Sequence, residues 1–238
     1  MKNLALCLIL MGVVAGAPLF AQTVIAQDDF SKLGDWKPAY GTWNANGALV
    51  QSSIKAGMAR IDKPLPQSGV YLLEFTAKYI DGGYADAKAY TSGPYHGGFG
   101  IHIGVDKPAP GKAWGNGKSY LLWINYDDTA PATSVHYGLR AQVYQSTTHT
   151  KMELMPDSSV EIFPREIVLQ NLNYLQYPLP IKMRVDTNTG EIRVYDPMQV
   201  GFYYYFYLDP KLLKGAYVSF RTNKLSMQFD DFKVTKLQ

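Results

Sequence analysis

Alternation of apolar and polar residues dominates the chain between residues 97 and 144. Three runs, residues 97–105, 119–128 and 134–144, place apolar side chains at every second position. This period of two is typical of strands that bury one face and expose the other. If the three strands share one sheet, it has an apolar face toward the core and a polar face on the other side.

The polar face of these strands predicts a contact surface for a polar ligand with apolar patches, such as a sugar. It gathers His102, Trp123, Asn125, Asp127, His136, Arg140 and Gln142. Sugars stack their C–H faces on flat aromatic rings, while planar polar groups take their hydroxyls. Glycines flank His102 and remove side chains that would block a ligand. Tyr95, His96 and Trp114 lie in loops that would rim the face. The alternative, that Trp123 packs beneath a covering loop, stays open.

The rest of the chain predicts strand after strand, separated by turn residues. The expected strands are residues 68–79, 181–186, 191–195, 200–208 and 216–222, with a hairpin formed by residues 151–155 and 160–163. Residues 164–175 are the one helix expected. Across Asp230 and Asp231 the apolar positions change phase, which indicates a β-bulge. This order predicts an all-β, antiparallel two-sheet sandwich, in one domain over residues 28–236.

The first residues of the chain predict an exported protein. Lys2 precedes an apolar run over residues 4–15, and small residues allow cleavage after Ala21 or as late as Ala26. The expected signal peptide is residues 1–21, and the destination is the periplasm or the cell exterior. Its apolar run is shorter than the roughly 20 residues that a membrane-spanning helix needs. The mature chain is therefore expected to have no membrane span.

The composition limits the kinds of cross-link, metal site and partner that we expect for the mature chain. The single cysteine, Cys7, leaves with the signal peptide, so no disulfide is expected and a metal site would need oxygen or imidazole ligands. Removing Lys2 lowers the formal net charge from +3 to +2, without the clustered basic footprint of a nucleic-acid-binding protein. The 18 tyrosines suit both sandwich cores and binding faces.

Several stretches resemble the concanavalin A-like (laminin-G-like) jelly rolls. The resemblance rests on residues 29–30, 41–43 and 46–49, on the strand pair 98–101 and 119–122, on the hairpin 181–195, and on the closing residues 215–220 and 229–234. It covers most of residues 28–236, with 145–180 and 202–207 as insertions. The resemblance implies that the first and last strands are neighbours in one sheet, which would bring Phe30 near Phe232. Its members include lectins, carbohydrate-binding modules, glycoside hydrolases and non-catalytic envelope proteins, so it implies a fold and not one function.

Catalysis by this chain has little support in the sequence. Glycoside hydrolysis needs two carboxylates flanking the scissile bond, and the Glu-x-Asp-x-Glu triplet of one hydrolase family is absent. The weak candidates are Glu153 and Glu161, which would share a face of their hairpin if its register is tight. Two solvated glutamates are the favoured interpretation. We therefore expect a non-catalytic protein.

Metal binding is also weakly indicated. Residues 186–191 are similar to the start of a calcium loop, with oxygen ligands at alternate positions, but the remaining ligands are missing and a hairpin turn is needed there. His102 and His136 would face each other across strands to bind a divalent ion, but a third and a fourth ligand are not identified. No metal and no cofactor are expected, and calcium is unsupported.

The sequence leads to three hypotheses of function. The first is an exported, lectin-like glycan-binding or surface-interaction module with a polysaccharide or glycan ligand. The second is a structural envelope protein that assembles with itself or with envelope partners, as periplasmic flagellar sheath proteins do. It rests on residues 202–207, where Phe202, Tyr204 and Phe206 would face the core and Tyr203, Tyr205 and Tyr207 an interface. A central strand covered on both faces is equally compatible. The third is a glycoside or 3-keto-disaccharide hydrolase.

Overall fold

The computed structural model describes residues 22–52, 57–83, 95–161, 177–197 and 199–237. These residues form two antiparallel eight-stranded sheets, packed face to face. The prediction of an all-β sandwich is confirmed. The expected signal peptide and the expected helix at 164–175 lie outside the described residues. Within the described residues, no helix has the length and apolar character needed to cross a membrane.

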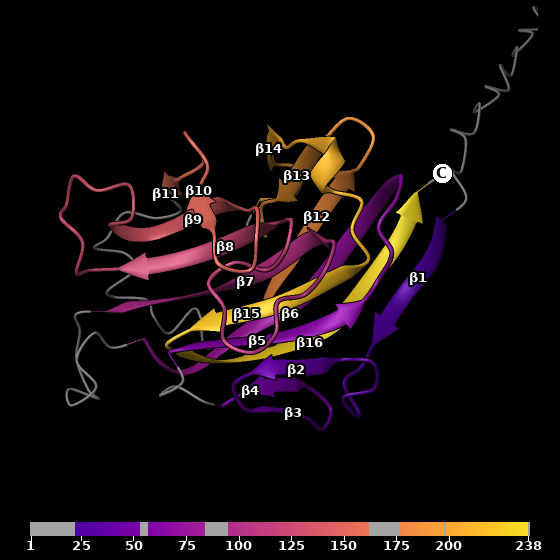
Figure 1. Ribbon diagram of the computed structural model, residues 1–238, viewed down its shortest axis with the longest axis horizontal. Helices are drawn as coiled ribbons and strands as arrows, with labels where there is room; N and C mark the ends of the chain where they lie inside the picture. Colours follow the sequence, from indigo (N-terminus) through magenta and orange to yellow (C-terminus); the bar gives the residue numbers. More distant parts are fainter. Residues whose placement is uncertain (1–21, 53–56, 84–94, 162–176, 198, 238) are drawn as a thin grey trace, which may run out of the picture.

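The first sheet has the most C-terminal strand near its middle. Its order is β14 (Tyr203–Tyr207), β13 (Glu191–Tyr195), β12 (Leu179–Asp186), β6 (Val70–Gly82), β16 (Leu225–Leu237), β4 (Leu49–Gln51) and β3 (Trp43–Ala45), and β1 (Gln22–Asp28) also pairs with β16. Figure 1 shows the indigo β1 beside the yellow β16. The expected pairing of the first and last strands is therefore confirmed.

The second sheet contains the three alternating strands as direct neighbours. Its order is β10 (Met152–Leu154), β9 (Gly138–Ser146), β8 (Ser119–Asp127), β7 (His96–Val105), β15 (Tyr217–Asn223), β5 (Met58–Pro64) and β2 (Lys37–Tyr40), and β11 (Val160–Glu161) pairs with β9. The third strand starts later than expected. Residues 134–137 form turns instead, and the strand begins at Gly138, whose φ of +80° suits glycine.

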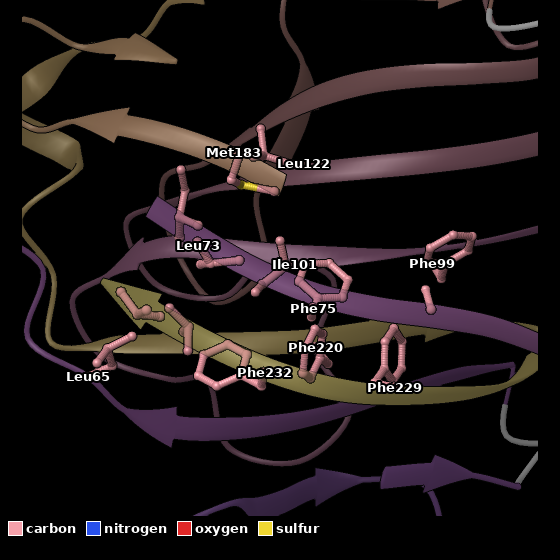
Figure 2. Packing of buried hydrophobic residues seen from close by; sticks show 14 of the residues in the cluster. Leu65, Leu73, Phe75, Phe99, Ile101, Leu122, Met183, Phe220, Phe229 and Phe232 are labelled. Carbon is pink, nitrogen blue, oxygen red and sulfur yellow. The ribbon is translucent and has the colours of Figure 1, made fainter. Parts of the chain in front are cut away.

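An aromatic cluster joins the two sheets at the centre of the core (Figure 2). The ring of Phe220 stacks on Phe229 at a centroid distance of 4.3 Å and on Trp36 at 5.0 Å. The edges of Phe75 and Phe232 close the cluster at 5.0 and 5.9 Å. Because β15 and β16 belong to different sheets, this cluster holds the layers together.

The bulge expected near the end of the chain is present in β16. Its register against β6 shifts between Asp230 and Lys233, and Asp231 has a φ of +52°. The extra residue changes which side chains point inward. It turns Phe232 toward the core, where Phe232 and Phe30 both contact the ring of Trp36.

Two local expectations were wrong. In the described part of the expected hairpin, β10 and β11 do not pair with each other, because each of them pairs with β9. Phe202 and Tyr204 do not enter the core and are 65% and 57% exposed. The hairpin of β12 and β13 is confirmed.

Candidate functional site

The outer side of the second sheet, here called the polar face, carries two rows of side chains that follow from the strand registers. One row is Arg60, Arg221, Gly100, Trp123 and Gln142. The next row is Asp62, Ser219, His102, Leu121 and Tyr144. The alternation predicted for β7, β8 and β9 is therefore confirmed, and β5 and β15 extend the face.

A loop between β7 and β8, residues 106–118 and here called the strap, folds onto this face. Buried Asn116 anchors it on three sides. Its Oδ1 accepts from the N–H of Ala109 at 2.9 Å, its Nδ2 donates to Ser219 Oγ at 2.9 Å, and its N–H donates to Ser146 Oγ at 2.7 Å. The strap is thus tied to β15 and β9 and covers part of the polar face.

Trp114 on the strap is a large aromatic side chain that stays half open at this face. It is 49% exposed. Its Nε1 donates to the carbonyl of Met152 at 2.9 Å, and its ring lies over the guanidinium of Arg221 at 4.9 Å. These contacts hold the indole in one orientation while about half of its surface meets solvent.

Trp123, the expected stacking platform, is only 7% exposed. It packs with Leu121, Met152 and the half-buried Tyr144 in a small apolar cluster. A Cβ atom at Gly98 would lie 2.4 Å from the indole ring, so this glycine makes room for the protein's own side chain. Trp123 therefore lies beneath the surface, as in the alternative left open by the sequence.

The structure links four of the predicted contact residues by hydrogen bonds. Trp123 Nε1 donates to Asn125 Oδ1 at 3.4 Å, and Asn125 Nδ2 donates to the carbonyl of His136 at 3.2 Å. Gln142 Nε2 lies 3.1 Å from His136 Nδ1, and the Tyr144 hydroxyl donates to Gln142 Oε1 at 3.1 Å. These bonds hold the loop between β8 and β9 against the sheet.

Asp127 and Arg140 form hydrogen bonds with residues of the same loop, one near each of its ends. Asp127 accepts from the N–H and the hydroxyl of Thr129 at 2.7 and 2.6 Å, and its other oxygen lies 3.0 Å from His96 Nδ1. Burial acts to raise the pKa of Asp127, but the bonds from Thr129 and the nearby His96 lower it overall. Arg140 Nε donates to the carbonyl of Tyr137 at 2.7 Å.

His102 lies away from that network, fully buried beside the strap. Its Nδ1 is 3.1 Å from Ser119 Oγ, and that hydroxyl donates to the carbonyl of Asn116. Ser119 has one hydroxyl proton, so His102 Nδ1 is the donor and Nε2 carries the lone pair. Burial, followed by the charges of Arg221 and Arg60, lowers the pKa of His102 well below 6.5. The imidazole is therefore neutral.

Sequence reasoning missed the buried charges next to His102. Arg60 and Arg221 are each 2% exposed, and Arg60 Nε donates to Asp62 Oδ1 at 3.0 Å. Their alternation with Ile61 and Phe220 would have placed them on the polar face. The burial depends on the strap, which no local pattern reveals.

The weak catalytic candidates are not brought together. Glu153 is opposite Gln145 and Glu161 is opposite Arg140 on β9, and these partners are an odd number of positions apart. Because side chains alternate along a strand, the two glutamates lie on opposite faces of the sheet. Both are exposed.

The calcium-like segment is a hairpin turn. The N–H groups of Asn188 and Thr189 donate to Asp186 Oδ1 at 2.9 and 3.3 Å. Within the described part of the chain, no group of three or more His, Cys, Asp or Glu side chains is placed to hold a metal ion.

The predicted interface tyrosines lie on the outer strand of the first sheet. Tyr203, Tyr205 and Tyr207 are all exposed, and neighbouring rings in this row lie 6.5 and 6.4 Å apart. The row continues onto β13, where Tyr195 contacts Tyr203 at 5.9 Å and the Arg193 guanidinium lies over the Tyr203 ring at 5.0 Å.

Comparison with solved structures identifies the fold. A protein of unknown function with a galectin-like fold from Bacillus subtilis aligns with a TM-score of 0.51 at 12% identity, covering 91% of this chain and 97% of that one. Peanut lectin in complex with a nonapeptide aligns with a TM-score of 0.51 at 13% identity, and the alignment covers 90% of this chain and 97% of the lectin chain. The metal-free carbohydrate recognition domain of Emp46p aligns with a TM-score of 0.52 at 12% identity, and the alignment covers 87% of this chain and 90% of that domain.

No family model and no curated protein sequence matches the chain. At these identities the similarity shows the fold alone. The chain has the concanavalin A-like β-sandwich fold of galectins and legume lectins, and the resemblance seen in its sequence is confirmed at the level of the fold.

Proposed function

We propose that this chain is a lectin-like carbohydrate-binding module whose contact surface is the polar face around Trp114. The observation that carries the proposal is an indole held in place by Met152 and Arg221 yet half open to solvent. A ring fixed before binding loses little entropy when a ligand stacks on it. Lectins and a carbohydrate recognition domain among the structures with this fold support the same class of function.

The predicted contact residues play two parts in this proposal. Trp123 and Tyr144 form the apolar floor beside Trp114. Asn125 and Arg140 are half-buried and present an amide and a guanidinium group at the rim, where sugar hydroxyls replace water as partners. Gln142 is buried and supports the rim through its bond to the carbonyl of Val135. His136 orients the amide of Gln142.

The Trp114→Ala variant is expected to bind glycans at least tenfold more weakly on a glycan array. Removing the stacking surface of a large aromatic side chain forfeits about 1.5–3 kcal/mol of apolar burial. Tyr177→Ala is the matched control, because Tyr177 is also an exposed aromatic residue and is 69% exposed. Unchanged glycan retention in Trp114→Ala would remove Trp114 from the site.

A second candidate function, self-assembly, is favoured by the outer edge of β14. Asp196 N donates to the carbonyl of Phe202, and Leu208 N donates to the carbonyl of Gly190. The backbone groups of the even-numbered residues of β14 therefore point toward β13. Backbone groups alternate along a strand, so those of Tyr203, Tyr205 and Tyr207 point away from the sheet. Among the described residues no strand pairs with this edge. Residues 200–208 also carry no charge, although charges usually protect exposed edges.

We infer that a second copy of the chain adds its own β14 antiparallel to this edge. Sedimentation at several concentrations is expected to show a dimer that disappears when Tyr203, Tyr205 and Tyr207 are replaced together by serine. Ile80→Ser with Val160→Ser is the control, because both side chains are exposed elsewhere. A monomer at every concentration, or a dimer that survives the triple replacement, contradicts this assembly.

A further inference from the structure

Two guanidinium groups lie side by side beneath the strap, and only one of them has a carboxylate partner. Arg60 and Arg221 are directly opposite each other on β5 and β15, and both are almost fully buried. Asp62 pairs with Arg60, and its pKa is raised mainly by burial. His102 is neutral. The cluster therefore carries an excess positive charge, and a buried charge without a counter-ion is strongly unfavourable.

Arg221 is the charge that lacks a partner. Its Nη1 donates to the carbonyl of Trp114 at 2.6 Å and approaches Met152 Sδ at 4.0 Å. Among the described residues no carboxylate forms an ion pair with Arg221, and its Nε and Nη2 have no hydrogen-bond acceptor. The Nε and Nη2 donors form the fork that binds a carboxylate through two parallel hydrogen bonds.

His102 presents an unused acceptor in the neighbouring row of the same face. Its Nε2 carries the lone pair, is fully buried and has no hydrogen-bond partner among the described residues. Such an orphaned group is costly unless a ligand or water completes it. A ligand that carries both an anionic group and a hydroxyl would satisfy Arg221 and His102 together.

We propose that Arg221, supported by Arg60 and His102, is the recognition point for the carboxylate of an acidic sugar, such as a uronic acid residue of a glycan bound at the polar face. This inference rests on the proposed function and specifies its ligand class. The fork of Arg221 binds the carboxylate, and His102 Nε2 accepts a hydroxyl of the same sugar ring. The Trp114 indole covers Arg221 and provides the stacking surface beside it.

The strap controls access to Arg221. The ring and the carbonyl of Trp114 lie against the guanidinium, so a sugar stacked at Trp114 has its carboxylate near Arg221.

The test compares charged glycans with neutral copies of the same sugars. Fragments of oligogalacturonate, oligomannuronate and hyaluronan are titrated by calorimetry, each beside its carboxyl-reduced counterpart. At least one acidic fragment is expected to bind about 10–100-fold more tightly than its neutral copy, which is the range for a hydrogen bond to a charged group. A sulfated galactan fragment and its desulfated copy show whether a negative charge of any kind is sufficient for tighter binding, or whether a carboxylate is required.

Variants locate the effect. Arg221→Gln is expected to lose the preference for the acidic fragment, and Arg221→Lys to keep only part of it, because an ammonium lacks the planar fork. Arg184→Gln is the matched control on the other sheet, where Arg184 pairs with Glu191, and is expected to keep the full preference. If Arg221→Gln does not fold, the comparison of acidic and neutral fragments on the wild-type protein still shows whether the protein prefers acidic glycans.

The outcomes separate this inference from the proposed function. Equal affinity for every acidic fragment and its neutral copy overturns the inference and leaves glycan binding intact. Tighter binding of the sulfated fragment than of any uronate overturns the assignment to a carboxylate. Binding of no fragment and no member of a neutral glycan array overturns both.

Discussion

Replacing Phe220 with alanine is expected to lower the free energy of unfolding by about 3–5 kcal/mol, the range for removing a buried phenylalanine ring. Phe220 is fully buried and lies between Phe229 and Trp36. The cavity would open between the two sheets, where the long strands β15 and β16 limit collapse. The cost therefore includes lost contacts as well as lost burial.

Urea unfolding followed by tryptophan fluorescence measures this loss. Phe202→Ala is the matched control, because Phe202 is 65% exposed, and it is expected to change the stability by less than about 0.5 kcal/mol. A loss below about 1 kcal/mol in Phe220→Ala would show that this cluster does not hold the sheets together.

Acidification from pH 7.5 to 5.0 is expected to cost about 2 kcal/mol of stability through His102 alone. Burial and the charges of Arg221 and Arg60 keep the pKa of this imidazole well below 6.5 in the folded protein. The unfolded chain takes up a proton below about pH 6.5 and the folded protein does not. The stability contribution is therefore complete above pH 6.5 and is lost as the pH falls, at up to about 1.4 kcal/mol per pH unit.

Urea unfolding of the wild-type protein and of His102→Gln over this pH range isolates the contribution. The difference in stability between the two proteins is expected to shrink by about 2 kcal/mol as the pH falls, because glutamine does not titrate. A difference that stays constant with pH would mean that the imidazole takes up its proton to the same extent in the folded and the unfolded state.

The architecture was predictable because local alternation determines it. The runs at 97–105 and 119–128 became β7 and β8 with the expected faces, and the phase change at Asp230 became a bulge. The hairpin expected between residues 151–155 and 160–163 was wrong in its described part. Residues 156–159 have turn chemistry, but β10 and β11 each pair with the preceding strand β9, and alternation alone does not specify which strand is the partner.

The candidate site was predictable only in part. Alternation placed Trp123, Asn125 and Gln142 on one face, and the registers confirm this arrangement. Their burial depends on loops that fold back onto the face, and Asn116 anchors one of them through contacts with distant strands. The charge cluster under the strap follows from that same docking, so Arg60 and Arg221 could not be recognised as buried before the loop was placed.

The position of β16 limits when the molecule can fold. This strand, residues Leu225–Leu237, pairs with β6, β4 and β1, and it carries Phe229 and Phe232. A nascent chain still missing these residues would expose both long edges that β16 later joins. The first sheet cannot be completed before residues 225–237 have left the ribosome, so the molecule completes its fold only after synthesis has passed residue 237.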